Sequence, residues 1–507
     1  MPPRGALREK IAEPSSRTWW AAAAAISLAA IALRVYDIGL KPLHHDEGVN
    51  AYFLRRLIEE GIFRYDPSNY HGPTLPYLSL LSASIFGLNT FALRLVPILF
   101  GLGTVVLALV LCWRLGRFGS LAAGALMALS AGAVFHSRYF IHEMMLVFFT
   151  LALVVSMLRF LERRDGLWLL PAGISAALIF ATKETCIITF GVLLIASVIL
   201  LIDRRIRPPA RGDTTPTWAP AEKRRALWGG VTAVVLMVLV SVVFYSSFFS
   251  HAQGVKDSLE TFAIWAKTGE QHHVHPWYQH LMWLWRAESA ILLLAFGGSL
   301  AVLRRGADRF VLFCALWGWG TLAAYSLVPY KTPWLTLNAL IPLTLVAGYA
   351  VEIINRRFGR PAASAVLAVA LVTTLYQSIQ INFIRYDDET IPYVYAPTGR
   401  EFHELMDQVG RVGRRMGTGT QTGVTVVYPD YWPMPWYLRD YPKAGFWGQM
   451  VDTTEPVLIG SESQREELEA RYGDRYIRIR SYKVRNGLDA VLYVRRDVFS
   501  SPLNPEE

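Results

Sequence analysis

The chain has 507 residues, of which 53% are hydrophobic and only 18% are charged, and its formal net charge is +10. Soluble domains carry about 25% charged residues, so this composition excludes an ordinary soluble enzyme and indicates a protein built for lipid. The basic residues stand in short clusters between apolar runs. That pattern is typical of loops facing an anionic membrane surface, and it argues against nucleic acid as a partner. The cysteines all lie inside apolar runs and form no metal motif.

At least ten apolar runs approach the ~20 residues with which a helix crosses a bilayer. The first starts near Trp19 and continues to about Tyr36, which is longer than the core of a signal peptide at about 7–15 residues. We therefore interpret it as a retained span with a cytoplasmic N-terminus. The expected spans are about 19–37, 94–113, 119–136, 144–161, 167–183, 186–202, 228–249, 287–303, 310–328, 334–354 and 361–382.

The shorter apolar stretch 74–88 decides the orientation of everything after it. Gly72, Pro73 and Pro76 crowd its start, so we expect it to lie in the interface rather than to span. The basic loops then all face the cytoplasm, among them the loop 203–227 with its seven Lys and Arg residues. This topology places the C-terminus outside.

Two imidazoles and two carboxylates stand side by side just beyond the first span, in His44-His45-Asp46-Glu47. An ionisable cluster at a membrane boundary indicates a functional site, although an ordinary polar loop would look the same. Adjacent residues point ~100° apart on a helix, so only one of the two carboxylates easily faces a given substrate atom. Such a carboxylate acts as a general base on an acceptor hydroxyl or binds a hard metal ion. Residues 49–60 predict an amphipathic helix on the outer surface.

Further ionisable residues gather in the loops on the same outer face. They are His71, Arg138, His142, Glu143, Lys183, Glu184, Tyr330 and Lys331. Cations from three separate loops could converge on one anion, such as a phosphate group in a low-dielectric site. Each single Lys or Arg could instead snorkel to the lipid headgroups, but the carboxylates beside them favour a shared site.

Metal binding is a further possibility for the outer loops. His272-His273-Val274-His275, in the loop 250–286, could ligate zinc, with a plain polar loop as the alternative. No cofactor is certain from the sequence. A divalent metal is the one candidate, with His45, Glu47 and His273 as its ligands.

The composition changes to that of a soluble domain from Arg385 onward. Helices are expected at 399–415 and 462–471, and short strands at 424–428, 456–459, 476–481 and 488–494. The sequence thus predicts a transmembrane domain over 1–384, with a first outer loop at 38–93, and a small extracytoplasmic α+β domain over 385–507. The aromatic loop, residues 428–437, suits sugar stacking or anchoring at the membrane interface, with proline-rigid packing as the alternative.

Six short motifs resemble those of GT-C glycosyltransferases, most closely the branch of the protein O-mannosyltransferases and aminoarabinose transferases. Asp46-Glu47 matches an Asp-Glu pair in the first outer loop, and residues 71–75 match a His/Lys-Pro-Pro-Leu segment with Gly72 for the first proline. The other matches are Arg94-Leu95-Val96-Pro97, Arg138-Tyr139 with Glu143 in place of Asp, Thr182-Lys183, and Lys331-Thr332-Pro333-Trp334. The resemblance covers about residues 20–340. It implies a mainly α, polytopic membrane protein of GT-C type, with about eleven transmembrane helices plus juxtamembrane helices.

The resemblance also implies a reaction, the inverting transfer of a hexose from a polyprenyl-phosphate donor to an acceptor outside the cytoplasm. The acceptor would be a glycan, a lipid or a protein. Asp46 would be the general base, with Glu47 and Glu143 supporting it or holding a metal. The implied host is a prokaryote, with the protein in its plasma membrane.

The lipid phosphate and sugar would be bound by a second set of residues. Arg138, Lys183 and Lys331 would neutralise the leaving lipid phosphate, and His71 and Tyr330 would contribute to the same binding site. Two departures from the family pattern stand near them. Glu143 in place of Asp lengthens the arm by one methylene, and Gly72 is expected to loosen the juxtamembrane turn.

Two other functions remain open. Residues 44–48, 330–334 and 428–437 resemble a prokaryotic group named for its association with flippase activity in archaeal-type N-glycosylation. The protein would then be a non-catalytic accessory that assists the flipping or handling of lipid-linked sugars. A proton- or ion-coupled transporter would instead need ionisable residues on broken helices near the bilayer midplane, where Arg34 is the candidate.

Overall fold

The structure, a computed structural model, describes residues 17–69, 71–206, 218–268, 273–303 and 308–500, and the chain divides into two compact units. The first unit comprises Met1–Ile38 and Leu57–Ile384, and the second comprises Gly39–Arg56 and Arg385–Glu507. The predicted first outer loop is therefore divided between the units. Its Asp46-Glu47 pair packs with the C-terminal residues.

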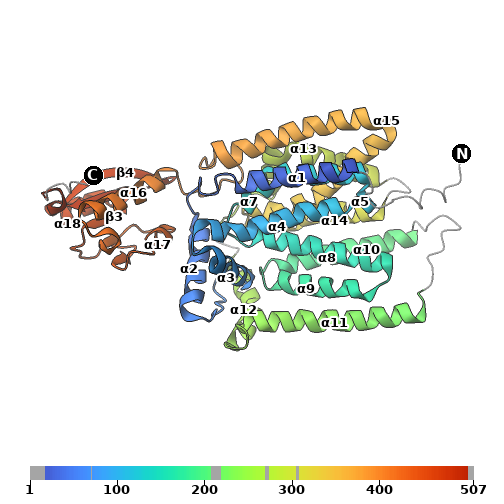
Figure 1. The fold of residues 1–507 in the computed structure, drawn as a ribbon, viewed down its shortest axis with the longest axis horizontal. Coiled ribbons are helices and arrows are strands. Elements are labelled where there is room, and N and C mark those ends of the chain that lie inside the picture. Colours follow the sequence, from blue (N-terminus) through green and yellow to red (C-terminus); the bar gives the residue numbers. More distant parts are fainter. Residues whose placement is uncertain (1–16, 70, 207–217, 269–272, 304–307, 501–507) are drawn as a thin grey trace. The chain divides into compact units, whose positions relative to one another are not determined.

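The first unit consists of helices, and its long helices run side by side (Figure 1). Its elements are α1 (Arg17–Val35), α3 (Thr74–Phe86), α4 (Thr90–Val110), α5 (Cys112–Leu115), α6 (Arg117–Leu129), α7 (Ala131–Ser137), α8 (Glu143–Arg163), η2 (Gly166–Trp168), α9 (Leu169–Phe180), α10 (Cys186–Ile206), α11 (Pro220–Tyr245), α12 (Gln253–Thr268), α13 (Gln279–Val302), α14 (Arg309–Leu327), η3 (Pro333–Thr336), α15 (Leu337–Ile379) and the π-helical turn η4 (Gln380–Ile384). Helix α2 (His45–Glu60) belongs partly to each unit.

The lengths of these helices agree with a membrane protein. Within the described residues, eight helices are long and apolar enough to cross a membrane, or nine if α6 and α7, bent by 56°, form one span. Shorter apolar helices cover Thr74–Phe86 and Gly166–Phe180, and α15 is broken at Gly359. Each predicted span falls on one of these helices or helix pairs. The polytopic, mainly helical fold is thus confirmed, while the count of eleven stays a prediction.

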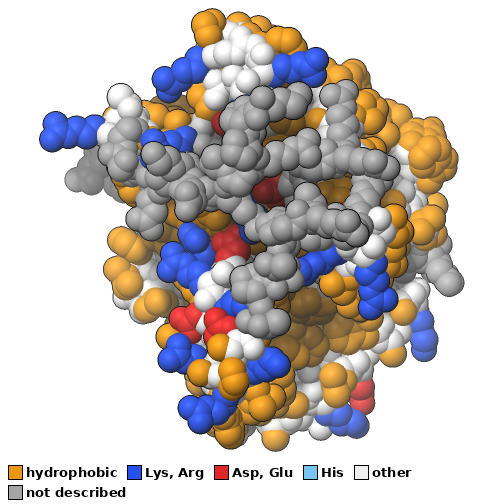
Figure 2. Space-filling model, turned by 90° about the vertical axis from the view of Figure 1, so that its right-hand side faces the viewer, with side chains coloured by type: hydrophobic (Ala, Val, Ile, Leu, Met, Phe, Trp, Pro, Cys, Tyr) orange, Lys and Arg blue, Asp and Glu red, His pale blue; other side chains and the backbone are white. Residues whose placement is uncertain are grey.

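Ion pairs join the helix ends that carry the basic clusters. Arg164 pairs with Glu222 at 3.6 Å, Arg309 with Asp203 at 3.5 Å, and Arg114 with Asp308 at 3.5 Å. These contacts bring the ends of α5, α8 and α10 together with the starts of α11 and α14. Figure 2 shows Lys and Arg side chains around this face of the molecule. One end of the helical unit is therefore basic, as the positive-inside pattern predicts.

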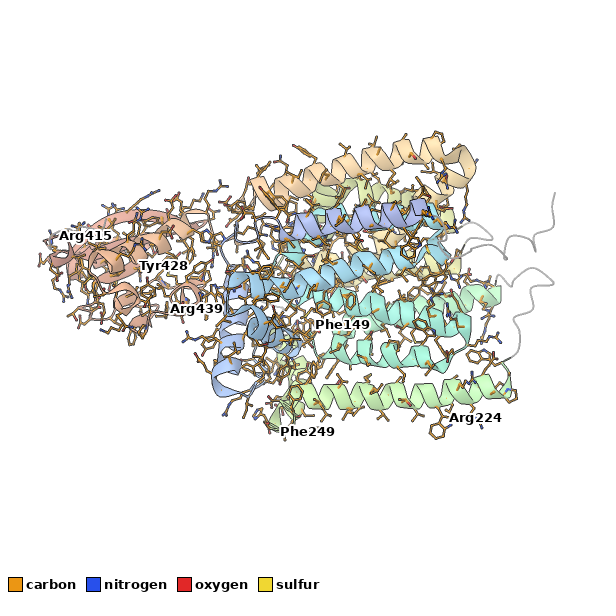
Figure 3. All side chains as sticks on the ribbon, viewed as in Figure 1. Phe149, Arg224, Phe249, Arg415, Tyr428 and Arg439 are labelled. Carbon is orange, nitrogen blue, oxygen red and sulfur yellow. The ribbon has the colours of Figure 1, made fainter. Side chains whose placement is uncertain are left out.

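Helix α11 illustrates how far the helices reach from this basic face. Arg224 near its start and Phe249 just beyond its end lie at opposite ends of the helix (Figure 3). A helix of 26 residues, rising ~1.5 Å per residue, is longer than the ~30 Å hydrocarbon core of a bilayer. Phe149 on α8 lies between the two ends (Figure 3), among the apolar side chains that fill the unit.

The second unit is a small α+β domain built on a five-stranded sheet with the order β2-β1-β3-β5-β4. Strand β1 pairs in parallel with β2 and β3, and β5 pairs antiparallel with β3 and β4. The elements are α16 (Glu401–Arg415), η5 (Gly419–Gln421), β1 (Val424–Val426), α17 (Met434–Tyr437), β2 (Ala444–Phe446), β3 (Val457–Ser461), η6 (Glu462–Gln464), α18 (Arg465–Tyr472), β4 (Tyr476–Arg485), β5 (Leu488–Arg495) and α19 (Asp497–Ser500).

The core of this domain follows the spacing read from the sequence. Phe402, Leu405 and Val409 form one buried face of α16 and share a core with Val457 and Ile459 of β3. Three- and four-residue spacing puts such residues on one side of a helix. The predicted α+β fold is confirmed; strand β2 is an addition, since its three residues carry no alternating pattern.

Candidate active site

Five ionisable side chains, the ionic cluster, come together in the first unit. His71 precedes α3, His142 and Glu143 stand at the start of α8, and Lys183 and Glu184 lie between α9 and α10. Lys183 forms a buried ion pair with Glu143. His71 Nδ1 lies 3.0 Å from Oε2 of Glu184, and the rings of His71 and His142 are 4.8 Å apart between centroids. The sequence predicted three of these residues as site residues and noted the other two as neighbours.

The backbone around Gly72 holds the cluster together. The N–H of Gly72 donates to the carbonyl of Thr182 at 3.1 Å, and both the N–H and the hydroxyl of Thr74 donate to the carbonyl of Ala181, at 3.2 and 2.7 Å. A Cβ at residue 72 would stand 2.0 Å from that same carbonyl oxygen, and a proline would lack the donating N–H. The expectation that Gly72 loosens the turn is therefore wrong. Glycine permits the close approach that brings His71 to the Lys183–Glu184 segment.

Burial and neighbouring charges set the protonation states in the cluster. Burial by itself would lower the pKa of Lys183, but Glu143 and then Glu184 raise it, so the ammonium ion persists. Burial would raise the pKa of Glu184, but His71 and Lys183 lower it. Burial lowers the pKa of His142 well below its usual value, and His71 and Lys183 reinforce the shift. The cluster thus holds a cation between two carboxylates in a low-dielectric site, where an unpaired charge is costly.

Arg138 and Lys331, two of the predicted phosphate-binding cations, bind the ends of helices. The Arg138 guanidinium donates to the carbonyls of Leu33 and Asp37, at 3.2 and 2.7 Å, beside the end of α1. The Lys331 ammonium donates to the carbonyl of Ser326 at 3.1 Å, near the end of α14. A cation suits these positions because the last carbonyls of a helix have no partner within the helix. Both residues therefore have a structural role, and their contact with a lipid phosphate stays a prediction.

Tyr330 lies where the segment after α14 meets the segment before α13. Its ring centroid is 5.4 Å from that of His273, and it forms an isolated antiparallel bridge with Val274. The N–H of Lys331 donates to the carbonyl of His273 at 2.9 Å. Residues 273–274 and 330–331 therefore support each other, which gives His273 a packing role.

The predicted metal ligands find no support in the structure. Among the described residues, no group of three or more His, Cys, Asp or Glu side chains is arranged to hold a metal ion. His45 and Glu47 make contacts within the second unit, described below, and His273 contacts Tyr330. His272 lies outside the described residues.

In the second unit, Asp46 and Glu47 open helix α2 and differ sharply in their surroundings. Glu47 is 1% exposed, and its Oε2 accepts a hydrogen bond from the N–H of His44 at 2.9 Å. This closes the first turn in the manner of a capping box. The Asp46 side chain keeps 39% of its surface exposed. Of the two carboxylates, Asp46 is the one that a substrate can reach.

Residues 43–48, the acidic turn, are held at several points by the C-terminal part of the second unit. The Leu43 N–H donates to the Tyr437 hydroxyl at 2.9 Å, and the Leu43 carbonyl accepts from Thr398 at 2.8 Å. His44 Nε2 donates to the carbonyl of Tyr395 at 3.1 Å, which leaves Nδ1 to accept from the N–H of Asp46 at 3.2 Å. This pattern assigns the neutral Nε2–H tautomer to His44, and burial lowers the pKa of that imidazole in agreement.

The aromatic loop, 428–437, packs against the acidic turn. A Cβ on Gly48 would lie 2.9 Å from Cβ of Pro433, so glycine is required for this close approach. The Trp432 ring lies edge-on to Tyr52 of α2, with centroids 5.9 Å apart. Tyr428, labelled in Figure 3, is buried and donates to the carbonyl of Leu488 at 2.6 Å. These contacts give the loop a packing role, and sugar stacking on it stays a prediction.

Two buried charged side chains bind the facing ends of the bent helix pair α6–α7, and the sequence analysis identified only one of them. Arg34 donates to the carbonyl of Ala128 at 3.0 Å, at the end of α6. Glu288, at a kink in α13, accepts from the N–H of Gly132 and the hydroxyl of Ser130, at 2.7 and 2.8 Å, at the start of α7. A transporter would use such broken ends to bind ions. Here the chain's own charged side chains occupy these helix ends, which favours a structural role for Arg34. The signal that could have identified Glu288 is a glutamate near the start of the apolar run 287–303.

Comparisons with known proteins show what this chain is similar to. Residues 69–255 match the family model described as dolichyl-phosphate-mannose-protein mannosyltransferase. Protein O-mannosyl-transferase 1 of Danio rerio is 28% identical over 195 residues, which cover 34% of this chain and 26% of that protein. The chain thus spans about a quarter of the length of this relative.

Solved structures agree over nearly the full length. ArnT from Cupriavidus metallidurans in the apo state has a TM-score of 0.65 at 13% identity, with 94% of this chain and 98% of ArnT covered. The same protein bound to undecaprenyl phosphate has a TM-score of 0.59 at 15% identity, with 94% and 97% covered. The likeness to the flippase-associated group stays a prediction. The chain therefore has a fold like that of ArnT, and its residues 69–255 match the dolichyl-phosphate-mannose-protein mannosyltransferase model.

Proposed function

We propose that the protein transfers a sugar, with inversion, from a polyprenyl-phosphate donor to an acceptor outside the cytoplasm. The ionic cluster carries this proposal. All five of its residues lie within the matched domain 69–255, and they stand at the helix ends opposite the basic face. An ion pair this well buried at the ends of apolar helices is costly to maintain without a use.

Lys183 is the cation proposed to meet the leaving phosphate. An ammonium group has three N–H donors, and the pair with Glu143 uses one of them. A fixed positive charge in a low-dielectric site stabilises the charge that develops on a leaving phosphate. Glu143 balances Lys183 when no donor lipid is bound, and His71 lies beside Glu184 at the edge of the same cluster. The similarity to a structure bound to undecaprenyl phosphate supports a polyprenyl phosphate as the donor.

Asp46 is the proposed general base. In a single displacement, the acceptor hydroxyl oxygen bonds to the anomeric carbon while its proton passes to the Asp46 carboxylate. The bond from that carbon to the phosphate oxygen breaks, and the phosphate leaves on the lipid with the electron pair. Attack on the face opposite the leaving group inverts the configuration. The partial exposure of Asp46 supports this role, since a buried carboxylate such as Glu47 could not meet an acceptor.

The orientation follows from the basic face. Lys and Arg clusters favour the cytoplasmic side, so the ionic cluster at the other helix ends would face outward. We infer a cytoplasmic N-terminus, an extracytoplasmic C-terminal domain, and residence in the plasma membrane of a prokaryote. A lipid tail would then lie in the bilayer, with its sugar at the outer surface.

The test is sugar transfer in proteoliposomes from a panel of radiolabelled polyprenyl-phosphate sugars, comparing the wild type with Asp46→Asn. Removing a general base should lower the transfer rate by about 10²–10⁴-fold, while donor binding stays intact. Asp452→Asn is the matched control, because it makes the same change at a highly exposed carboxylate of the same domain. Equal rates for the wild type and Asp46→Asn would exclude Asp46 as the base. Donor binding without transfer from any sugar would instead point to the accessory function in lipid-linked sugar handling.

A further inference from the structure

We propose that Asp430 is a positioning residue for Asp46: through His45, and braced by Arg485, it fixes the turn that presents the base. The proposal rests on the proposed function, in which Asp46 takes the acceptor proton. It assigns the C-terminal domain a part in catalysis, namely to hold the acidic turn in place.

The chain of contacts is short. His45 precedes Asp46 in the first turn of α2, and its Nδ1 lies 3.2 Å from Oδ1 of Asp430. The other carboxylate oxygen of Asp430 binds the guanidinium of Arg485. Arg485 also donates to the carbonyl of Trp432 at 3.2 Å, which ties the pair to the aromatic loop. One carboxylate thus bridges the acidic turn and strand β4.

Asp430 acts at the middle of a turn whose two ends are already fixed. At one end, the backbone of Leu43 is hydrogen-bonded to Tyr437 and Thr398. At the other end, Gly48 packs directly on Pro433. The Asp430–His45 contact falls between them, next to the base itself. A turn held at its ends and at its centre leaves Asp46 few alternative positions.

The energetics favour positioning over stability as the purpose of this bridge. The side chains of His45 and Asp430 are 39% and 30% exposed, and polar contacts with such exposure add little to folding stability. Catalysis is far more sensitive, because a displacement of about 1 Å in a catalytic group can cost about 10²-fold in rate. Loss of the Asp430–His45 contact should therefore affect turnover more than unfolding, whereas loss of Asp430 also leaves the Arg485 guanidinium, which is 10% exposed, without its carboxylate.

The experiment compares Asp430→Ala and Asp430→Asn with the wild type, using the full-length protein in proteoliposomes. The measurements are kcat, the KM for the acceptor, donor binding, and hydrogen exchange of the backbone amides of residues 44–48. Asp387→Ala is the matched control. It removes an aspartate of the same domain from its ion pair with Arg400 without touching the acidic turn.

We expect Asp430→Ala to lower kcat by about 10–100-fold, with unchanged donor binding and faster exchange at residues 44–48. Asp430→Asn keeps an oxygen that can accept from His45, so it should fall between the wild type and Asp430→Ala. It also serves as the test variant if Asp430→Ala does not fold. Asp387→Ala should match the wild type in kcat and in exchange at these amides.

Two results would overturn the proposal. One is an unchanged kcat in both Asp430 variants, and the other is a lower kcat with unchanged exchange at residues 44–48. If the wild type itself transfers no sugar, the proposed function fails. The exchange measurement would then still show whether Asp430 holds the acidic turn, so the two failures are distinguishable.

Discussion

The ionic cluster of the first unit and the acidic turn of the second place carboxylates beside histidines in opposite ways. In the ionic cluster, Glu143 is buried and paired directly with Lys183. In the acidic turn, Asp46 is partly exposed, and it is the surrounding backbone that is fixed. The ionic cluster thus holds paired opposite charges in an apolar interior, whereas the acidic turn exposes one carboxylate to solvent at a defined position.

This difference teaches which property each site depends on. A buried charge depends on its partner, because removing one member leaves the other without solvation. An exposed charge depends on geometry, since water solvates it whatever its neighbours do. Substitutions in the ionic cluster should therefore mainly lower the free energy of unfolding, and substitutions at Asp46 should mainly lower the rate of sugar transfer. The predictions below test that contrast.

The largest effect on stability is expected for Lys183→Met, which leaves Glu143 buried without its cation. Breaking a buried pair in this way typically costs about 3–5 kcal/mol in the free energy of unfolding. Thermal unfolding in detergent would measure it. Adding Glu143→Gln to Lys183→Met should recover part of the loss. The control is Arg480→Ala, which breaks an exposed pair with Glu404 and should cost below about 1 kcal/mol. Equal losses in the buried and exposed pairs would refute the contrast.

Lys331→Met should cost about 1–3 kcal/mol, the range for leaving a buried polar group without its partner. The reason is that the ammonium of Lys331 donates hydrogen bonds to carbonyls near the end of α14. Unfolding in detergent and the KM for the donor should be measured together. A higher donor KM without loss of stability would instead assign Lys331 to the lipid phosphate, as the family resemblance implies.

Glu47→Ala should lower stability by about 0.5–2 kcal/mol, as expected for the loss of a helix cap. Glu47→Gln should keep most of that stability, since the amide oxygen can still accept from the N–H of His44. Comparing the two variants by thermal unfolding separates the capping role from a chemical one. A large fall in transfer rate for Glu47→Gln, with stability retained, would show that Glu47 takes part in the reaction.

The smallest effect on stability is expected at Asp387, and it should depend on pH. The hydrogen bonds from Arg400 lower the pKa of Asp387 in the folded protein. Its stabilising contribution is therefore present above the unfolded pKa of about 3.9 and is lost as the pH falls through the lower, folded value. Asp387→Asn should destabilise by below about 1 kcal/mol at neutral pH, and the difference from the wild type should disappear in acid. A difference that did not depend on pH would contradict the assignment.

The sequence predicted best those features of the structure that depend on a single local property of the chain. Apolar length located the helices, and the positions of Lys and Arg located the basic face. It was weaker at single charged residues. Arg138 and Lys331 fit a phosphate site by residue type, yet both donate hydrogen bonds to carbonyls at helix ends. A cation binds the final carbonyls of a helix as readily as it binds a phosphate. Only the three-dimensional path of the chain shows which of these two partners lies near a given cation.

The sequence by itself determined that this is a polytopic, mainly helical membrane protein with a small α+β domain, because hydrophobic length and periodicity are local properties. The tertiary structure alone decided that residues 39–56 pack with the C-terminal domain, that Glu47 is buried while Asp46 is exposed, and that His45 meets Asp430. These outcomes depend on contacts between residues hundreds of positions apart. Burial and charge pairing arise only when folding brings such residues together, so no local pattern in the chain records them.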